Sequence, residues 1–145
     1  MAYLNLKPEE IKYLVVHCSA TPADMDIGAK EIKQWHRERG WLDIGYHYVI
    51  TRDGDVETGR PEDTPGAHAR GYNQVSLGIC MVGGTKKDKR TQENNFTEAQ
   101  FATLRRLLEG LESDYPNAEV IGHRDLPGVI KGCPSFDAGG WYYDE

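Results

Sequence analysis

The chain has 145 residues, of which 39% are hydrophobic and 28% are charged, and its formal net charge is −6. This composition fits one soluble domain, and the acidic balance argues against a general nucleic-acid-binding protein, which would present a basic face. No apolar run approaches the roughly 20 residues of a membrane-spanning helix. The first residues lack the basic region and apolar core of a secretory signal. We therefore expect a protein that starts in the cytoplasm with its cysteines reduced.

The first third of the chain predicts a strand, a helix and a hairpin. After a short turn at residues 8–10, residues 13–17 form an apolar run that ends at His17, as in a strand buried on both faces. Residues 29–39 have helical spacing, with Asp26 as the expected N-cap and Gly40 as the stop. Residues 46–50 alternate as a strand does, and a turn at residues 53–54 predicts pairing with residues 56–58.

The second half of the chain predicts two more strands and two more helices. Residues 75–82 indicate a second buried strand. Thr97 and Gln100 have the spacing of a capping box at the start of a helix that ends before Pro116. A short strand at residues 119–121 and a last helix within residues 135–143 complete the pattern. Strands interleaved with helices predict an α/β protein, with one domain over residues 1–145 and a central mixed β-sheet flanked by helices.

A loop rich in glycine and proline, residues 120–137, displays His123, Lys131 and Cys133. Imidazole and thiolate are good zinc ligands, and a catalytic zinc usually has three protein ligands and an open fourth position. A third ligand is expected at the end of a strand, where His17 stands. We therefore expect a metal site of His17, His123 and Cys133 in a surface cleft at strand ends, with Lys131 beside it.

Each of these residues also has a simpler interpretation. A lone histidine is more often structural than a ligand, a lone cysteine is usually a small buried hydrophobe, and the spacing matches no compact zinc signature. Cys18 or Cys133 could instead be the nucleophile of a cysteine peptidase with a histidine as base. The HRDL sequence at residues 123–126 is similar to a kinase catalytic loop, but Ile130 stands where that loop needs asparagine.

Several separate blocks of sequence are similar to one known family. They are HCSAT at 17–21, residues 31–60, HARGYN at 68–73, SLGICMVGG at 76–84, NFTEAQ at 95–100 and CPSFD at 133–137. These blocks resemble the zinc amidase lysozymes of T-odd coliphages, which are type 2 N-acetylmuramoyl-L-alanine amidases related to the peptidoglycan recognition proteins. The resemblance implies one catalytic Zn²⁺ held by His17, His123 and Cys133, with Tyr46 and Lys131 as catalytic residues.

The implied reaction is hydrolysis of the amide between N-acetylmuramic acid and L-alanine in bacterial peptidoglycan, which gives host lysis. An ammonium such as Lys131 can stabilise the developing oxyanion. We expect Tyr46 to position the water or the intermediate, because a phenol with a pKa near 10 is a poor base at neutral pH. Asp125 is expected to steady His123 or its loop. The candidates for lining the substrate groove are His36, Trp41, His68 and Asn73.

Peptidoglycan is the implied partner, and the enzyme would remain in the host cytoplasm until its release to the cell wall. We expect a monomer that binds neither nucleic acid nor membrane. One alternative is that the same fold also inhibits the phage RNA polymerase, as the resembled lysozymes do. Another alternative is a non-catalytic peptidoglycan-binding module. Such modules typically lack the cysteine ligand, so the presence of Cys133 argues against it.

Overall fold

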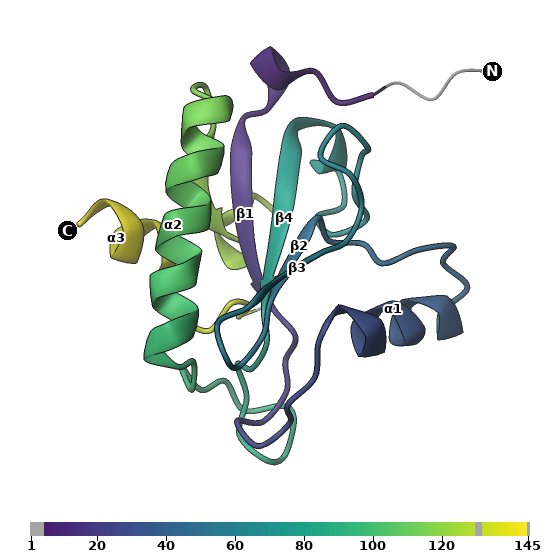
Figure 1. Cartoon of the computed structure of the whole chain (residues 1–145), viewed down its shortest axis with the longest axis vertical. Helices are drawn as coiled ribbons and strands as arrows, with labels where there is room; N and C mark the ends of the chain where they lie inside the picture. The colour runs from purple at the N-terminus through teal and green to yellow at the C-terminus, as the bar shows by residue number, and fades with distance from the viewer. Residues whose placement is uncertain (1–4, 130–131, 145) are drawn as a thin grey trace.

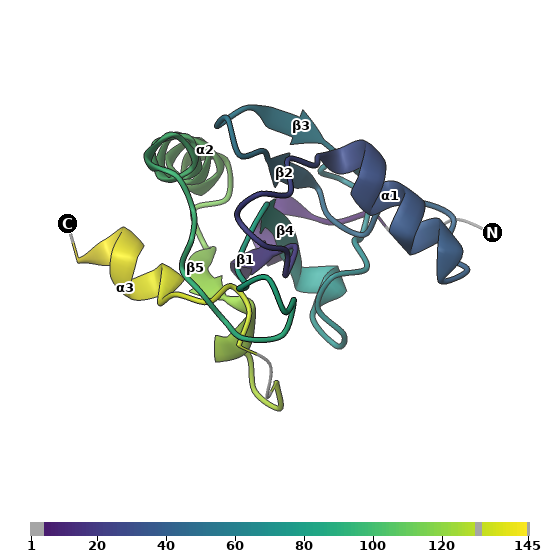
Figure 2. The ribbon, with the colours of Figure 1, turned by 90° about the horizontal axis from the view of Figure 1, so that it is seen from below.

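The computed structural model describes residues 5–129 and 132–144. Five strands form one sheet in the order β3-β2-β4-β1-β5. Figure 1 labels four of them, and Figure 2 also labels β5 at the edge of the sheet. The strands are β1 (Tyr13–Cys18), β2 (Tyr48–Ile50), β3 (Val56–Thr58), β4 (Ser76–Met81) and β5 (Glu119–Gly122), and the helices are α1 (Ala29–Glu38), α2 (Glu98–Asp114) and α3 (Ala138–Tyr143). Only β3 runs antiparallel to its neighbour. The predicted α/β class with a central mixed sheet is confirmed.

The main core lies between the sheet and α2. Side chains alternate across a strand, so Leu14 and Val16 of β1 share one face, and this face packs against Leu104 and Leu108 of α2. The short helix α3 adds Tyr142 to the same core. Figure 2 shows α2 and α3 on one side of the sheet and α1 on the other.

The opposite face of the sheet is covered only in part. Ile32 of α1 packs against Val49 and Cys80 in a second, smaller core. Val15 belongs to a third cluster on this face, with Ala69 and residues of the 121–129 segment. By the same alternation His17 lies on this face, beyond Val15 and toward the end of β1. The face opposite α2 therefore carries the candidate ligand.

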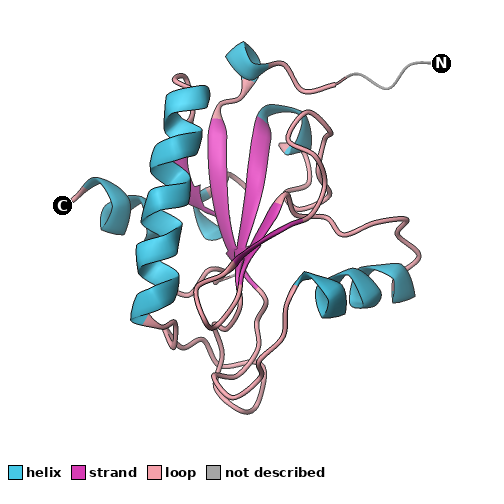
Figure 3. Ribbon diagram, viewed as in Figure 1, coloured by secondary structure: helices cyan, strands magenta, loops and turns pink. Residues whose placement is uncertain are grey.

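Figure 3 shows how the helices and strands alternate with loops. Their residue boundaries agree closely with those expected from the sequence, with two corrections. Asp26 does not cap α1, because the N-cap is Gly28, whose N–H donates to Glu31 Oε1. The strand expected from residue 46 begins only at Tyr48. The His47 N–H already donates to the Gly78 carbonyl, but this hydrogen bond lies just before the paired residues of β2 and β4. The predicted capping box of Thr97 and Gln100 is confirmed. No helix in the described part of the chain is long and apolar enough to cross a membrane.

Candidate active site

The parallel sheet brings His17 and His123 together. The pairing of β1 with β5 places Val16 opposite Gly122, the last residue of β5, so the next residues, His17 and His123, are neighbours. Their ring centroids are 4.5 Å apart. His17 is buried, with 2% of its surface exposed, and His123 is half-buried in a 3-10 turn that follows β5. The two imidazoles therefore meet at the carboxyl end of the sheet, although 105 other residues separate them in the sequence.

The loop after β5 turns back and adds Cys133. The Arg124 N–H donates to the Cys133 carbonyl over 2.8 Å. Pro134 packs so closely on Gly122 that a Cβ there would lie 2.8 Å from its Cδ. Asp125 supports this turn, since its Oδ2 accepts the Gly122 N–H.

The ligand atoms of His17, His123 and Cys133 all lie within 4.8 Å of one another. The Cys18 N–H also donates to Cys133 Sγ over 2.9 Å. The hydrogen bond with the Cys18 thiol and then burial raise the pKa of Cys133 well above 9.0. Lys131, the fourth residue expected here, lies outside the described residues. The structure thus gathers the three expected ligands into one group that could hold a metal ion.

His68 lies directly against His17. His68 Nδ1 and His17 Nε2 are 2.9 Å apart, and the rings meet edge to face with centroids separated by 4.9 Å. On its other side, His68 Nε2 is 3.4 Å from Ser76 Oγ. Burial, followed by the charges of His47, His123 and Arg60, lowers the pKa of His68 to about 3. His68 is therefore a neutral imidazole at physiological pH.

Tyr46 also approaches His17, one of the candidate metal ligands. Its ring centroid lies 5.0 Å from that of His17 and 5.6 Å from that of His36. Burial, followed by the nearby cysteine thiols, raises the pKa of Tyr46 well above 10. A phenol in this state can donate a hydrogen bond, and the positioning role of Tyr46 stays a prediction from the sequence.

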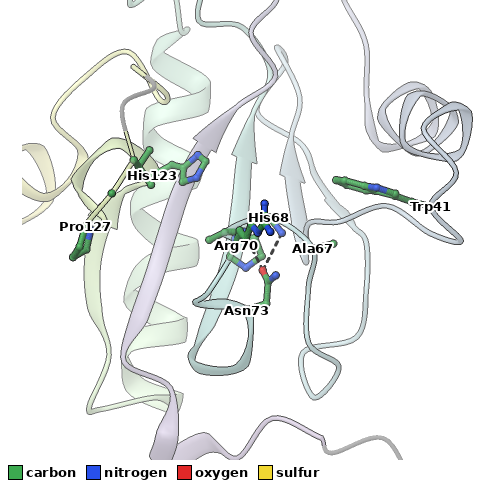
Figure 4. A pocket seen from close by; sticks show the side chains of 10 residues that line it. Trp41, Ala67, His68, Arg70, Asn73, His123 and Pro127 are labelled. Atoms are coloured by element: carbon green, nitrogen blue, oxygen red, sulfur yellow. Dashed lines mark hydrogen bonds between the residues drawn. The ribbon is translucent and has the colours of Figure 1, made fainter.

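A cavity of about 580 Å³ opens beside this group (Figure 4). Figure 4 shows Trp41 at one side and Pro127 at the other, with His68 and His123 between them. The lining residues are Trp41, Ala67, His68, Ala69, Arg70, Asn73, His123, Pro127, Gly128 and Val129. A volume of this size is typical of ligand sites, and His123 joins it to the candidate metal site.

Three of the four residues expected in the substrate groove line this cavity, namely Trp41, His68 and Asn73. Two of them have a further structural contact. His68 touches His17, and Asn73 Oδ1 accepts the backbone N–H groups of His68 and Ala69, each over 3.0 Å. His36 is buried under Trp41, with ring centroids 4.5 Å apart, and is absent from the cavity's described lining.

The cavity is also lined by Arg70 and by the turn at residues 127–129, which no sequence pattern predicted. Arg70 is exposed, and no salt bridge to it is formed within the described ranges. Its position two residues after His68, in the HARGYN block, was a usable signal. No sequence signal pointed to the turn at residues 127–129, because its position depends on the path of the loop after β5.

Comparison with known proteins gives a consistent result. A family model of N-acetylmuramoyl-L-alanine amidases matches residues 7–136. The chain is 50% identical to an endolysin of Klebsiella phage KP32, covering 94% of this chain and 88% of that protein. It is 47% identical to the endolysin of Escherichia phage T7, covering 98% and 93%.

Two solved structures have the same fold. The Ph2119 endolysin of a Thermus scotoductus bacteriophage aligns with a TM-score of 0.76 and 27% identity, covering 99% of this chain and 90% of that chain. A mutant of Drosophila PGRP-LB in complex with tracheal cytotoxin aligns with a TM-score of 0.75 and 26% identity, covering 94% and 82%. The chain therefore belongs to the N-acetylmuramoyl-L-alanine amidase family and is an amidase of the phage endolysin type.

Proposed function

We propose that this amidase is zinc-dependent and hydrolyses the amide between N-acetylmuramic acid and L-alanine in bacterial peptidoglycan. The observation that carries the proposal is the convergence of His17, His123 and Cys133, whose ligand atoms lie within 4.8 Å of one another. The match to the amidase family supports the reaction class. The relatives named as endolysins and the peptidoglycan recognition proteins support the substrate.

The donor set fits zinc better than Mg²⁺ or Ca²⁺. Two imidazoles and one thiolate suit Zn²⁺, whereas Mg²⁺ and Ca²⁺ prefer oxygen ligands. Three protein ligands leave a fourth position for water, as in catalytic zinc sites. Bound there, zinc would lower the pKa of its water to about 7 and polarise the scissile carbonyl. His17, His123 and Cys133 are the residues that would hold the ion.

One contact of the surrounding protein favours the thiolate form of Cys133. The Cys18 N–H points at Cys133 Sγ and acts to lower its pKa, against the Cys18 thiol and burial, which raise it overall. A bound zinc ion would supply the further stabilisation that the thiolate needs. Two neutral imidazoles with one thiolate would leave a divalent ion with a net charge of +1, so the centre would stay electrophilic. The burial of His17 lowers the local dielectric, which strengthens electrostatic interactions with a developing oxyanion.

Tyr46 and Lys131 complete the proposed chemistry. The Tyr46 phenol lies beside His17 and has a hydrogen to donate, so it can orient the attacking water or the tetrahedral intermediate. We assign the oxyanion to Lys131, whose ammonium would offset the charge that develops on the carbonyl oxygen. The assignment of Lys131 rests on the sequence resemblance and on its position two residues before Cys133.

The shape of the surface suits an extended substrate. A second cavity, of about 680 Å³, shares Trp41 and Ala67 with the cavity beside His123. Two adjoining cavities can hold two chemically different parts of one molecule. The glycan and the stem peptide of peptidoglycan are two such parts, joined at the bond to be cut.

The deciding experiment measures zinc content and amide cleavage on the same samples. We would determine zinc by elemental analysis in wild type and in Cys133→Ser, and follow turbidity loss and new amino groups with purified cell walls. We expect about one zinc per wild-type chain, and loss of both zinc and cleavage in the variant. Cys80→Ser is the matched control for zinc content, since Cys80 is a second buried cysteine that lies outside the ligand group.

The alternatives give different results in the same assay. Cleavage that persists in metal-free protein and is stopped by a thiol-blocking reagent would replace the zinc mechanism with a cysteine peptidase. Zinc binding without new amino groups would indicate a binding module. Inhibition of the phage RNA polymerase stays a prediction from the sequence resemblance, and a transcription assay with added protein would test it.

A further inference from the structure

We propose that His68 is a positioning residue that fixes the tautomer of His17 and thereby presents His17 Nδ1 to the metal. This inference deepens the proposed function and rests on it for the metal alone. It is built on a line of hydrogen bonds that runs from the Tyr72 carbonyl through Ser76 and His68 to His17. The direction of each bond follows from which atoms can donate.

The series of hydrogen bonds begins at the Tyr72 carbonyl, which can only accept a hydrogen bond. The Tyr72 carbonyl oxygen lies 2.7 Å from Ser76 Oγ, so the Ser76 hydroxyl must donate its one hydrogen there. Ser76 Oγ also lies 3.4 Å from His68 Nε2. Since the Ser76 hydrogen is already used, Ser76 can only accept from His68. His68 therefore carries its hydrogen on Nε2.

The next bond transmits this choice to His17. His68 is 9% exposed, and a charge buried there without a carboxylate partner would be costly. A neutral imidazole has one N–H and one nitrogen lone pair, so His68 Nδ1 is the acceptor. His17 Nε2, 2.9 Å away, must then be the donor. A neutral His17 that is protonated on Nε2 keeps its lone pair on Nδ1. In the proposed arrangement this lone pair faces an ion shared with the ligand atoms of His123 and Cys133.

The His68 ring is held in place on several sides. Gly78 lacks a side chain where a Cβ would lie 2.6 Å from His68 Cγ, and a Cβ at Gly66 would lie 2.6 Å from His68 Cδ2. Asn73 Oδ1 fixes the backbone through the His68 N–H. These contacts hold the ring against His17 and leave little freedom to rotate, as a positioning role requires.

The first test measures zinc affinity by competition with a chromogenic chelator, using zinc alone as the probe. His68→Leu removes the acceptor, and we expect the affinity to fall about 10- to 100-fold. His68→Asn keeps a carbonyl oxygen near the place of Nδ1 and should recover most of the loss. Ser76→Ala leaves the His68 ring in place and should give a smaller loss, up to about 10-fold.

The matched control is His47→Leu. His47 is a second buried imidazole of this face, with a ring centroid 5.8 Å from that of His68, but its bonds go to the Thr64 carbonyl and the Gly78 N–H. Its loss should lower thermal stability and leave zinc affinity unchanged. Circular dichroism would restrict the comparison to folded variants, and Ser76→Ala and His68→Asn keep the test decisive if His68→Leu does not fold.

The second test reads the tautomer directly. Long-range ¹H–¹⁵N spectra of the zinc-free protein should show His17 protonated on Nε2 in wild type and a mixture of tautomers in His68→Leu. An unchanged tautomer together with unchanged zinc affinity would overturn the inference. Wild type that binds no zinc would overturn the proposed function instead, while the tautomer spectra would still decide the role of His68.

Discussion

The backbone N–H of Cys18 donates a hydrogen bond to Cys133 Sγ over 2.9 Å, between residues 115 positions apart. This bond joins the last residue of β1 to the loop that follows β5. It places the sulfur beside His17, the residue before Cys18, and offers it a donor that favours the thiolate. The same contact thus ties the loop to β1, so the geometry of the candidate site depends on the register of the parallel strands.

The role of Tyr46 can be separated from metal binding. We expect Tyr46→Phe to keep its zinc, because the ring still packs beside His17, and to lower kcat by roughly 10²- to 10³-fold through loss of one donor to the transition state. Zinc content and cleavage of purified cell walls would be measured on the same preparation. A variant with near wild-type kcat would show that the hydroxyl has no part in the reaction.

Arg70 is expected to recognise a carboxylate of the stem peptide. It lines the cavity beside His123, and a guanidinium pairs well with carboxylates. We expect Arg70→Ala to lower kcat/KM about 10-fold, mainly by raising KM, as a charge-assisted bond of about 1.5 kcal/mol would predict. Lys87→Ala removes the same charge from an exposed loop and is the control. Equal effects of the two variants would attribute the loss to the overall field of the protein.

The buried imidazoles predict lower stability in mild acid. Burial is the main cause that lowers the pKa of His36 and His47 below 6.5. Nδ1 of each accepts a backbone N–H, from Gly45 and Gly78 respectively, so protonation there would break a hydrogen bond. Below pH 6.5 the unfolded chain therefore binds more protons than the folded one. The stability that is complete above this pH is lost as the pH falls toward the folded pKa values.

Urea unfolding of the chelator-treated protein between pH 7.5 and 5.5 would measure this effect. Each imidazole that stays neutral should lower the free energy of unfolding by up to about 1.4 kcal/mol per pH unit below its unfolded pKa. His47→Gln should be less stable at pH 7.5 but have a shallower pH dependence. A pH dependence as steep as that of wild type would contradict the assignment.

Gln100 ties the start of α2 to the end of β2 and to the residue that follows β4. Its amide nitrogen donates to the carbonyls of Ile50 and Val82, its oxygen accepts the Thr97 N–H, and the side chain is fully buried. Gln100→Leu should lower the free energy of unfolding by about 1–3 kcal/mol, because these polar groups would lose their partner. Gln34→Leu, on the exposed surface of α1, should change it by less than about 0.5 kcal/mol. Comparable losses in the two variants would contradict this account.

The sequence was sufficient to predict an element wherever neighbouring residues alone determine the local structure. The apolar runs that became β1 and β4, the capping box of α2 and the glycine after α1 are short-range signals, and they held. It was insufficient where a distant partner competes with the local choice. Gly28 caps α1 in place of Asp26 because Glu31 and Glu57 reach the first backbone N–H groups of the helix.

The sequence by itself determined the residue types of the site and the secondary structure that carries them. It also placed His17 at a strand end and His123 with Cys133 in one loop. Only the tertiary structure decided that the β1–β5 register brings the two histidines together, that Arg70 faces the same cavity, and that His68 supports His17. The physical reason is that packing between segments remote in sequence sets the strand order and the path of the loop after β5. No local pattern of residues encodes such packing.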